Sequence, residues 1–278
     1  MLRSINDLQD YAIRATDGDI GHVTDFYFDD EAWVIRYLVV DTGSWLLSRR
    51  VLISPIAIGQ PDWAAEVLPV SITQDQVKNS PDIDTDRPVS RQHEISYLGY
   101  YGYPYYWGGA GLWGGGAYPG LMVPGGYMGL ASTPHSAQSE TGKAFDRAEE
   151  ARHHDDDPHL RSCQALLTYH IEATDGGLGH VEGLLVDPET WAIRYLIVNT
   201  SNWWMGHKVL IAPEWIENVS WQDATVSINV TRQAVKDAPT YDPDAALDQE
   251  HEVGLYEHYG RPGYRATGKK REPALSSD

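Results

Sequence analysis

The chain has 278 residues, enough for one large or two small domains, and it carries a formal net charge of −19. Nucleic-acid binding needs clustered Lys and Arg, so this charge balance disfavours nucleic acid as a partner. Cys163 is the only cysteine, which excludes an intramolecular disulfide and suits a reducing cytoplasm. No apolar run is long enough for a signal peptide or a membrane-spanning helix, so we expect a cytoplasmic protein with no transmembrane segment.

The phrase Asp-Gly-x-x-Gly-His-Val occurs twice, at residues 17–23 and 175–181, which are 158 positions apart. At that offset and without a gap, residues 17–55 match residues 175–213 at 19 of 39 positions, where chance would give roughly one in sixteen. The chain therefore contains a duplication. We expect repeat 1 at 1–102, a low-complexity and charged linker at 103–160, repeat 2 at 161–260 and a basic tail at 261–278.

The repeated phrase predicts a tight turn that leads into a β-strand. Asp and Gly tolerate positive φ, so Asp-Gly indicates a hairpin, and the next glycine indicates a bulge or a close backbone approach. A phosphate-binding loop is disfavoured, because that loop has a different glycine spacing and precedes a helix. The structural turn motif comprises Asp17, Gly18 and Gly21 in copy one and Asp175, Gly176 and Gly179 in copy two.

Short β-strands dominate the remaining pattern of each copy. Strands are expected at 11–16, 23–28, 33–41, 50–54 and 66–72, and in copy two at 167–174, 180–186, 191–200, 208–212 and 225–230. A capping box at residues 73–76 predicts a short helix, which is repeated from Thr231. Five or six strands in about 65 residues favour a small barrel, since closure removes exposed strand edges.

The predicted fold class is thus mainly β, with two small β-barrels, each followed by a short C-terminal helix. Residues 97–130 consist almost entirely of Gly, Tyr, Trp and Pro and would join the two barrels. This composition predicts a flexible linker, with docking or self-association as the alternative.

Aromatic and basic residues suggest an interaction surface near the loop between the third and fourth strands. Aromatic side chains dominate interface hot spots, although core packing can also explain tryptophans. The candidate residues are Trp45, Trp203, Trp204, Arg36 and Arg194. For the arginines the simplest interpretation is a cross-strand ion pair with Glu31 or Glu189, and a partner contact is the second.

Residues of catalytic type form no recognisable constellation, so we predict no enzyme, no catalytic residue, no cofactor and no metal. The run of His and Asp at 153–159 has metal-ligand chemistry, but its compact spacing favours a solvated polar segment. His93-Glu94 recurs as His251-Glu252, and we expect these residues to be structural or exposed.

The turn motif, followed by Trp-x-Ile-Arg-Tyr-Leu-x-Val and then Val-Leu-Ile-x-Pro, resembles the PRC-barrel. This domain is shared by the cytoplasmic part of the photosynthetic reaction-centre H subunit and by the C-terminal domain of a ribosome maturation factor. Both copies show the pattern, over about 8–102 and 165–260, so the chain looks like a tandem PRC-barrel protein, bacterial by resemblance. The later Tyr101-Gly102 and Tyr259-Gly260 favour the H-subunit branch.

The resemblance implies a non-enzymatic binding or scaffold protein that acts through protein–protein interaction with an unknown protein partner. One alternative is a membrane-peripheral accessory of a photosynthetic or electron-transfer complex, although the membrane helix of the H subunit has no counterpart here. The other is association with ribosomes or RNA processing, which the acidic composition disfavours. Identical units commonly associate isologously, so we expect the barrels to pair within the chain or to form a homodimer.

Overall fold

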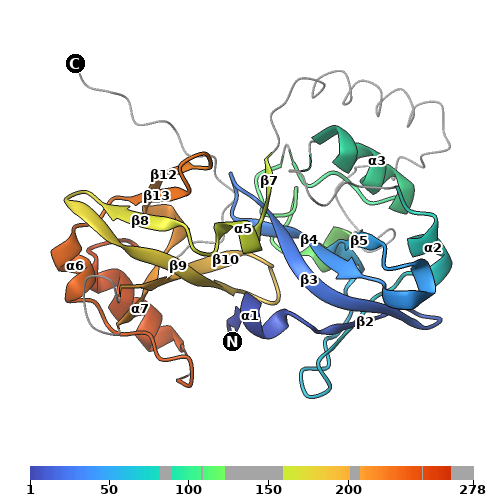
Figure 1. The fold of residues 1–278 in the computed structure, drawn as a ribbon, viewed down its shortest axis with the longest axis horizontal. Coiled ribbons are helices and arrows are strands. Elements are labelled where there is room, and N and C mark those ends of the chain that lie inside the picture. The colour runs from blue at the N-terminus through green and yellow to red at the C-terminus, as the bar shows by residue number, and fades with distance from the viewer. Residues whose placement is uncertain are drawn as a thin grey trace.

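The structure, a computed structural model, describes residues 1–81, 89, 91–107, 109–122, 159–200, 207–245 and 247–263. These residues form two lobes side by side along the long axis of the molecule (Figure 1). Copy one makes up one lobe and copy two the other, and each lobe is built around one β-sheet. The predicted mainly β fold is confirmed, and the two small barrels that the sequence predicts correspond to these two sheets.

The sheet of copy one has the strand order β5-β4-β3-β2-β6. Its strands are β2 (Ala12–Arg14), β3 (Asp19–Asp29), β4 (Val34–Asp41), β5 (Arg50–Ile53) and β6 (Val67–Pro69). The helices are α1 (Ile5–Leu8), α2 (Gln74–Lys78) and α3 (Arg91–Tyr101), with 3₁₀ turns η1 (Gly43–Leu46), η2 (Pro55–Ala57) and η3 (Pro119–Met122). Neighbouring strands are antiparallel except β2 and β6, which run parallel.

The sheet of copy two repeats this arrangement in the order β11-β10-β9-β8-β13-β12. Its strands are β8 (His170–Ala173), β9 (Gly176–Val186), β10 (Ile193–Asn199), β11 (Lys208–Ile211), β12 (Ile216–Ser220) and β13 (Thr225–Ile228). The helices are α5 (Cys163–Leu166), α6 (Arg232–Lys236) and α7 (Gln249–His258), with a 3₁₀ turn η4 (Pro213–Trp215). β8 and β13 are the parallel pair here.

In the described part of the chain neither sheet is closed into a ring by strand pairing. Loop hydrogen bonds link the two ends of the first sheet instead. The Gly59 N–H donates to Pro69 O and the Ser71 N–H donates to Ala57 O, each over 2.8 Å. The core lies against both sheets and includes Ile35, Leu38 and Leu52 with their counterparts Ile193, Leu196 and Leu210, all buried.

The turn motif has the close backbone approach that its second glycine predicts. A Cβ atom on Gly21 would lie 1.9 Å from Asp41 O, and one on Gly179 would lie 1.9 Å from Asn199 O. The pairing of β2 with β3 also shifts register next to Gly21, as expected for a bulge. Only glycine therefore fits at these two positions.

The aspartate of the motif has a second role, at the start of a helix. Asp17 Oδ1 accepts a hydrogen bond from the Gln74 N–H over 2.8 Å, and Asp175 Oδ1 accepts one from the Arg232 N–H over 2.7 Å. The predicted capping box at Thr73 and Gln76 is present at α2. In each copy the hairpin turn and the short helix are thus joined by one carboxylate.

The prediction of a flexible linker is wrong for its described part. α3 begins before this segment, and the chain that follows packs into the core, with Tyr103, Tyr106, Leu112 and Trp113 buried. The rings contact one another, as in the T-shaped pair of Tyr106 and Trp113 with centroids 6.1 Å apart. Aromatic side chains bury a large apolar area for each residue that is ordered, which offsets the entropy cost of many glycines.

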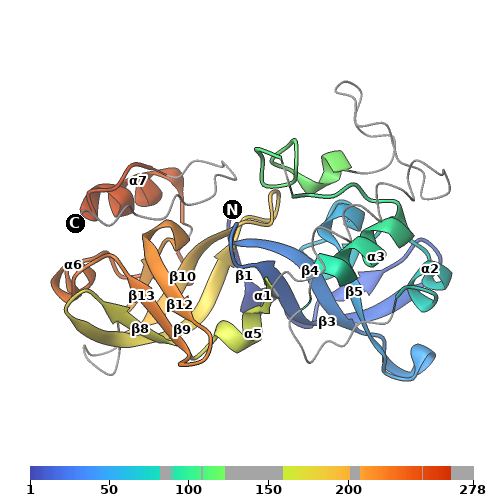
Figure 2. The ribbon, with the colours of Figure 1, turned by 90° about the horizontal axis from the view of Figure 1, so that it is seen from above.

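A short strand at the start of each copy pairs with the sheet of the other copy. β1 (Arg3–Ser4) is antiparallel to β9, with Arg3 opposite Val186. β7 (Leu160–Ser162) is antiparallel to β3, with Arg161 opposite Phe28. Arg3 and Arg161 are 158 positions apart, so the exchange is reciprocal. Figure 2 places β1, α1 and α5 together where the two lobes meet.

The turns that lead into β4 and β10 also bond to each other across the junction. The Ile35 N–H donates to Trp191 O and the Ile193 N–H donates to Trp33 O, each over 2.8 Å. Equivalent groups therefore meet on both sides, which is the isologous geometry of a two-fold dimer. The two copies form an internal pseudo-dimer.

The glycine contacts predict a strong and position-specific effect on stability. Gly21→Ala should lower the free energy of unfolding by about 1–3 kcal/mol or more, because the new Cβ overlaps a backbone carbonyl. Gly99→Ala is the matched control, since no atom lies within 4 Å of a Cβ at this helical position. The control should be neutral or stabilising by up to about 1 kcal/mol. Urea unfolding checks both, and equal effects would contradict the close approach.

The exchanged strand should contribute to the stability of the whole molecule. Leu160 on β7 is fully buried, so Leu160→Ala should cost about 2–5 kcal/mol and shift a single cooperative unfolding transition. The counterpart Leu2 is only partly buried, and Leu2→Ala should cost less. Two separate transitions, with only one of them affected, would show that the copies unfold independently.

Candidate functional site at the junction of the two copies

Two grooves lie at the junction, and their walls are equivalent under the 158-residue offset. Groove 1 has a volume of about 450 Å³ and groove 2 of about 180 Å³. Groove 1 is formed by residues 58–61 and Trp63 of copy one together with Pro188, Glu189 and Trp191 of copy two. Groove 2 is formed by residues 216–219 and Trp221 of copy two together with Asp30 and Trp33 of copy one. Met1, Arg3 and residues 118–120 add to the wall of groove 1.

Two lining residues of groove 2, Asp30 and Trp221, complete a cation–aromatic–carboxylate set with Arg161 of β7. The Arg161 guanidinium lies over the Trp221 ring, 4.6 Å from its centroid. Its Nε donates to Asp30 Oδ2 over 2.9 Å, and both side chains are largely buried. Burial raises the pKa of Asp30, while the hydrogen bond and the charge of Arg161 oppose that rise. The arginine charge is therefore neutralised within the protein.

Groove 1 has the cation and the aromatic ring but a proline in place of the aspartate. The Arg3 guanidinium lies over Trp63, 4.4 Å from the ring centroid, as its counterpart does in groove 2. The position equivalent to Asp30 is Pro188. Within the described residues, the buried Nε of Arg3 has no hydrogen-bond partner. Arg3 is thus positioned by β1 and by the Trp63 indole, but no carboxylate among the described residues pairs with it.

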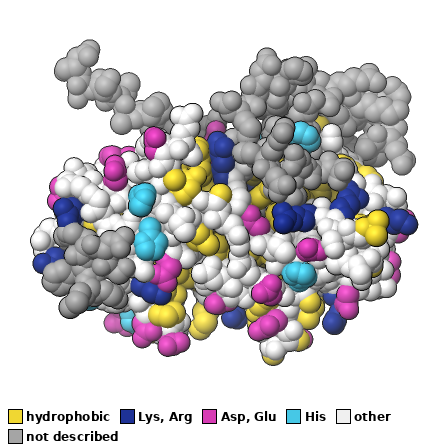
Figure 3. Space-filling view, in the orientation of Figure 1, with side chains coloured by type: hydrophobic (Ala, Val, Ile, Leu, Met, Phe, Trp, Pro, Cys, Tyr) yellow, Lys and Arg dark blue, Asp and Glu magenta, His cyan; other side chains and the backbone are white. Residues whose placement is uncertain are grey.

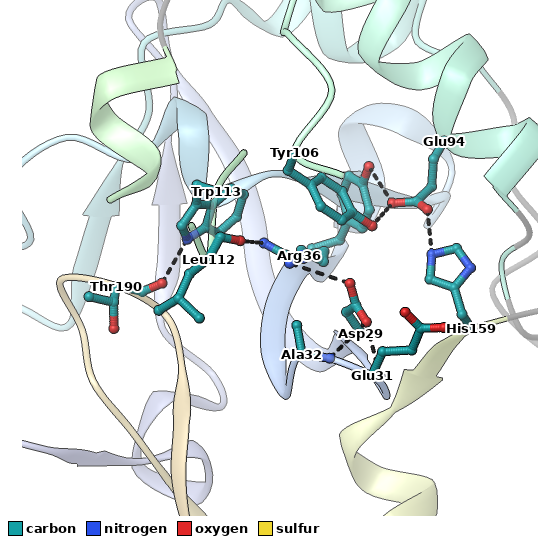
Figure 4. A network of polar contacts seen from close by, with 11 residues as sticks. Asp29, Glu31, Ala32, Arg36, Glu94, Tyr106, Leu112, Trp113, His159 and Thr190 are labelled. Atoms are coloured by element: carbon teal, nitrogen blue, oxygen red, sulfur yellow. Dashed lines mark hydrogen bonds and ion pairs between the residues drawn. The ribbon is translucent and has the colours of Figure 1, made fainter. Parts of the chain in front are cut away.

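A buried polar network lies beside the grooves and joins the copies (Figure 4). Arg36 on β4 is 2% exposed, and its guanidinium donates to Leu112 O over 2.7 Å and to Asp29 Oδ2 over 3.3 Å. The same guanidinium lies 3.8 Å from the centroid of the Tyr106 ring. The segment after α3 thus covers Arg36 with an aromatic ring and a carbonyl oxygen.

The second part of the network is centred on Glu94, which is 1% exposed on α3. One carboxylate oxygen accepts hydrogen bonds from the hydroxyls of Tyr37, over 3.2 Å, and of Tyr106. The other lies 2.7 Å from His159 Nε2, in the segment that leads into β7. Burial and the adjacent Glu94 carboxylate raise the pKa of Tyr37 well above its ordinary value, so this phenol remains a donor.

The equivalent site in copy two is simpler. Arg194 Nη2 donates to Glu252 Oε1 over 2.7 Å, and the Tyr195 hydroxyl donates to the same oxygen over 2.8 Å. Glu252 is the counterpart of Glu94. In copy one Glu94 pairs with His159 and Arg36 pairs with Asp29. The equivalent charged residues of the two copies are therefore paired with different partners.

A further contact ties this network to the other copy. The Trp113 indole N–H donates to Thr190 O over 2.7 Å, and Thr190 lies in the turn between β9 and β10. Trp113 is 1% exposed and lies 4.7 Å from the Arg36 guanidinium, measured at its ring centroid. The described charges of the network are therefore paired internally, which makes it a structural clasp between the copies.

The structure places the predicted interaction residues in different environments. Arg36 is buried on β4 and forms an ion pair with Asp29, whereas the simplest interpretation of the sequence was a pair with Glu31. Arg194 also differs from the simplest interpretation, since it pairs with Glu252 on α7 and not with Glu189. Asp29 lies two residues before the expected Glu31, whereas Glu252 is 58 residues from Arg194 and could not be predicted from local strand alternation.

The predicted tryptophans and the metal-like run are only partly described. Trp45 is 37% exposed, and its indole N–H donates to Ile20 O. Trp203 and Trp204 lie outside the described residues, as does the run of His and Asp except for His159. No group of three or more His, Cys, Asp or Glu side chains in the described ranges could hold a metal ion.

The groove residues also recur in the sequence, although the predicted interaction surface does not include them. Trp63 recurs as Trp221 and Arg3 as Arg161 at the same offset. In each copy, however, the arginine is 60 positions away from the tryptophan that it contacts, so the sequence did not show that they meet. Glu94 and Glu252 also recur, and both lie on helices. Repeats mark such residues, and only the fold shows what they contact.

The visible surface is mixed in character. On the face drawn in Figure 3 acidic side chains are spread over both lobes, with hydrophobic side chains exposed between them. Among the described helices, none has both the length and the apolar character needed to cross a membrane.

Two comparisons with known proteins each find a similarity to part of the chain. Residues 2–77 match the family described as PRC-barrel domain, a range that runs from β1 to α2 and includes the first turn motif. A protein of Deinococcus radiodurans, described as uncharacterized, is 35% identical over 82 residues, which make up 29% of this chain and 29% of that protein. The match thus spans less than a third of that relative. The similarity to the PRC-barrel domain is therefore shown for residues 2–77 of the chain.

Proposed function

We propose that the protein is a non-catalytic binding or scaffold protein of the cytoplasm, built from two PRC-barrel-type units. Residues 2–77 are the first unit, and the second begins at β7. The two units act as one body, and the junction between them presents the surface that binds a partner protein. Association with an electron-transfer or photosynthetic complex would be one form of such binding.

The reciprocal exchange of β1 and β7 is the observation that carries this proposal. Each copy supplies a strand that the other copy needs, so the orientation of the two units is fixed by backbone hydrogen bonds. The duplicated order of strands and the recurring turn motif support the assignment of the second unit to the same type. A rigid pair of units presents a preorganised surface, which lowers the entropy cost of binding.

The state of the ionisable groups favours binding over catalysis. An acid, base or nucleophile must reach a substrate, whereas Asp29, Arg36 and Glu94 are buried and paired with one another or with neighbours. Burial also raises the pKa of the Cys163 thiol well above its ordinary value, which keeps this group in its unreactive form. The half-buried Arg3 and Trp63 and the exposed Tyr118 of groove 1 suit recognition of another molecule.

Affinity capture from a native lysate of the source organism tests the proposal. The full-length chain should retain one protein in a near-stoichiometric amount, and the heat-denatured chain should not. Isothermal titration calorimetry with the purified partner should reproduce the complex. A folded chain that retains no specific protein, or one that turns over a substrate with no partner, would contradict the proposal.

A further inference from the structure

The two grooves differ at one position that decides whether their arginine is satisfied. In groove 2 the Nε of Arg161 donates to the Asp30 carboxylate over 2.9 Å. In groove 1 the same atom of Arg3 is buried and has no hydrogen-bond partner among the described residues. Both guanidinium groups lie on an equivalent tryptophan, at 4.4 Å in groove 1 and 4.6 Å in groove 2.

We propose that groove 1 binds an aspartate or glutamate side chain of a partner protein, with its carboxylate on Arg3 above Trp63. This inference rests on the proposed binding function and names the chemistry that the binding surface recognises. Groove 2 is the internal precedent, because its carboxylate belongs to an aspartate on a turn of this same chain. The occupant is therefore expected to be a polypeptide carboxylate.

The chemistry of Arg3 favours such an occupant. A buried N–H of a charged group is unfavourable while it lacks an acceptor, and a carboxylate is the acceptor that a guanidinium binds most strongly. Trp63 holds the guanidinium from one side, so the side chain needs little ordering when the ligand arrives. β1 fixes the Arg3 backbone opposite Val186 of the other copy.

Groove 1 also has room for a ligand. Its volume of about 450 Å³ is within the usual range for small binding pockets, whereas groove 2 has about 180 Å³. Pro61, Pro188 and the exposed Tyr118 give it an apolar wall beside the cation. An acidic residue with an apolar or aromatic neighbour would fill both parts of this groove.

Glu189 also lines groove 1 and is exposed. Its charge opposes an incoming carboxylate, so it should weaken the binding without removing it. Removal of the Arg3 charge should therefore weaken binding of the carboxylate, and removal of the Glu189 charge should strengthen it.

NMR titration of the full-length chain provides the test. The probe is a peptide blocked at both ends with the sequence of residues 28–33, Phe-Asp-Asp-Glu-Ala-Trp, which contains the acidic turn of groove 2. A second peptide carries Asn and Gln in place of Asp and Glu. The acidic peptide should shift the Trp63 indole N–H and the Arg3 Nε–H signals with millimolar affinity, and the neutral peptide should not.

Variants of the groove separate the contributions. Arg3→Gln should weaken binding about tenfold, and Glu189→Gln should tighten it by about twofold. Pro188→Asp should abolish binding, because it supplies the internal carboxylate that groove 2 has. Arg14→Gln is the matched control, since the Arg14 side chain is 58% exposed and lines neither groove. It should leave the affinity unchanged.

Several results would overturn the proposal. These are an absence of shifts up to about 10 mM acidic peptide, equal binding of the neutral peptide, equal binding of inorganic phosphate, or an unchanged affinity in a folded Arg3→Gln variant. Dispersed amide signals establish that each variant is folded. A captured partner that binds wild type and Arg3→Gln equally would remove groove 1 from the interface while leaving the binding function in place.

Discussion

The reciprocal exchange of β1 and β7 is the contact on which the rest of the structure depends. Strands of two and three residues are too short to be stable alone, so each forms only on the sheet of the other copy. The helix that follows each strand is placed by the same exchange, and Ile5 of α1 and Cys163 of α5 are completely buried. The grooves and the buried clasp exist because this exchange brings the copies together.

Strand periodicity and turn chemistry predicted most of the elements, because both depend on neighbouring residues. The hairpin at Gly18, the close approach at Gly21 and the capping box at Thr73 all follow from local backbone physics. The exchanged strands could not be predicted in this way, since β7 is specified by its pairing with β3. The packing of residues 97–107 and 109–122 could not be predicted for the same reason, since their aromatic rings are stabilised only by the surface that they cover.

The candidate site, too, could be predicted only in part from the sequence. The sequence identified Arg36 as a candidate residue and predicted Glu31 as its ion-pair partner. In the structure its neighbours are Asp29, Tyr106 and Leu112. A buried charge is tolerable only when it is paired and hydrogen-bonded. Arg36 is satisfied by Asp29 of the neighbouring strand β3 and by Tyr106 and Leu112 of one distant segment. Residues that recur at the offset of 158 positions, such as Glu94 and Glu252, have equivalent positions in both copies. Residues that differ at that offset, such as Asp30 and Pro188, indicate where the two copies differ in their contacts.

The exchange of Asp30 for Pro188 has a consequence for symmetry. Two separate chains of one sequence carry the same residue at every position, so a homodimer presents its pockets in identical pairs. Fusion of both copies into one polypeptide removes that constraint, and one pocket can be filled by the protein itself while the other stays open. A molecule with two-fold architecture can thereby be asymmetric in its binding, with a single open pocket and one ligand for each polypeptide.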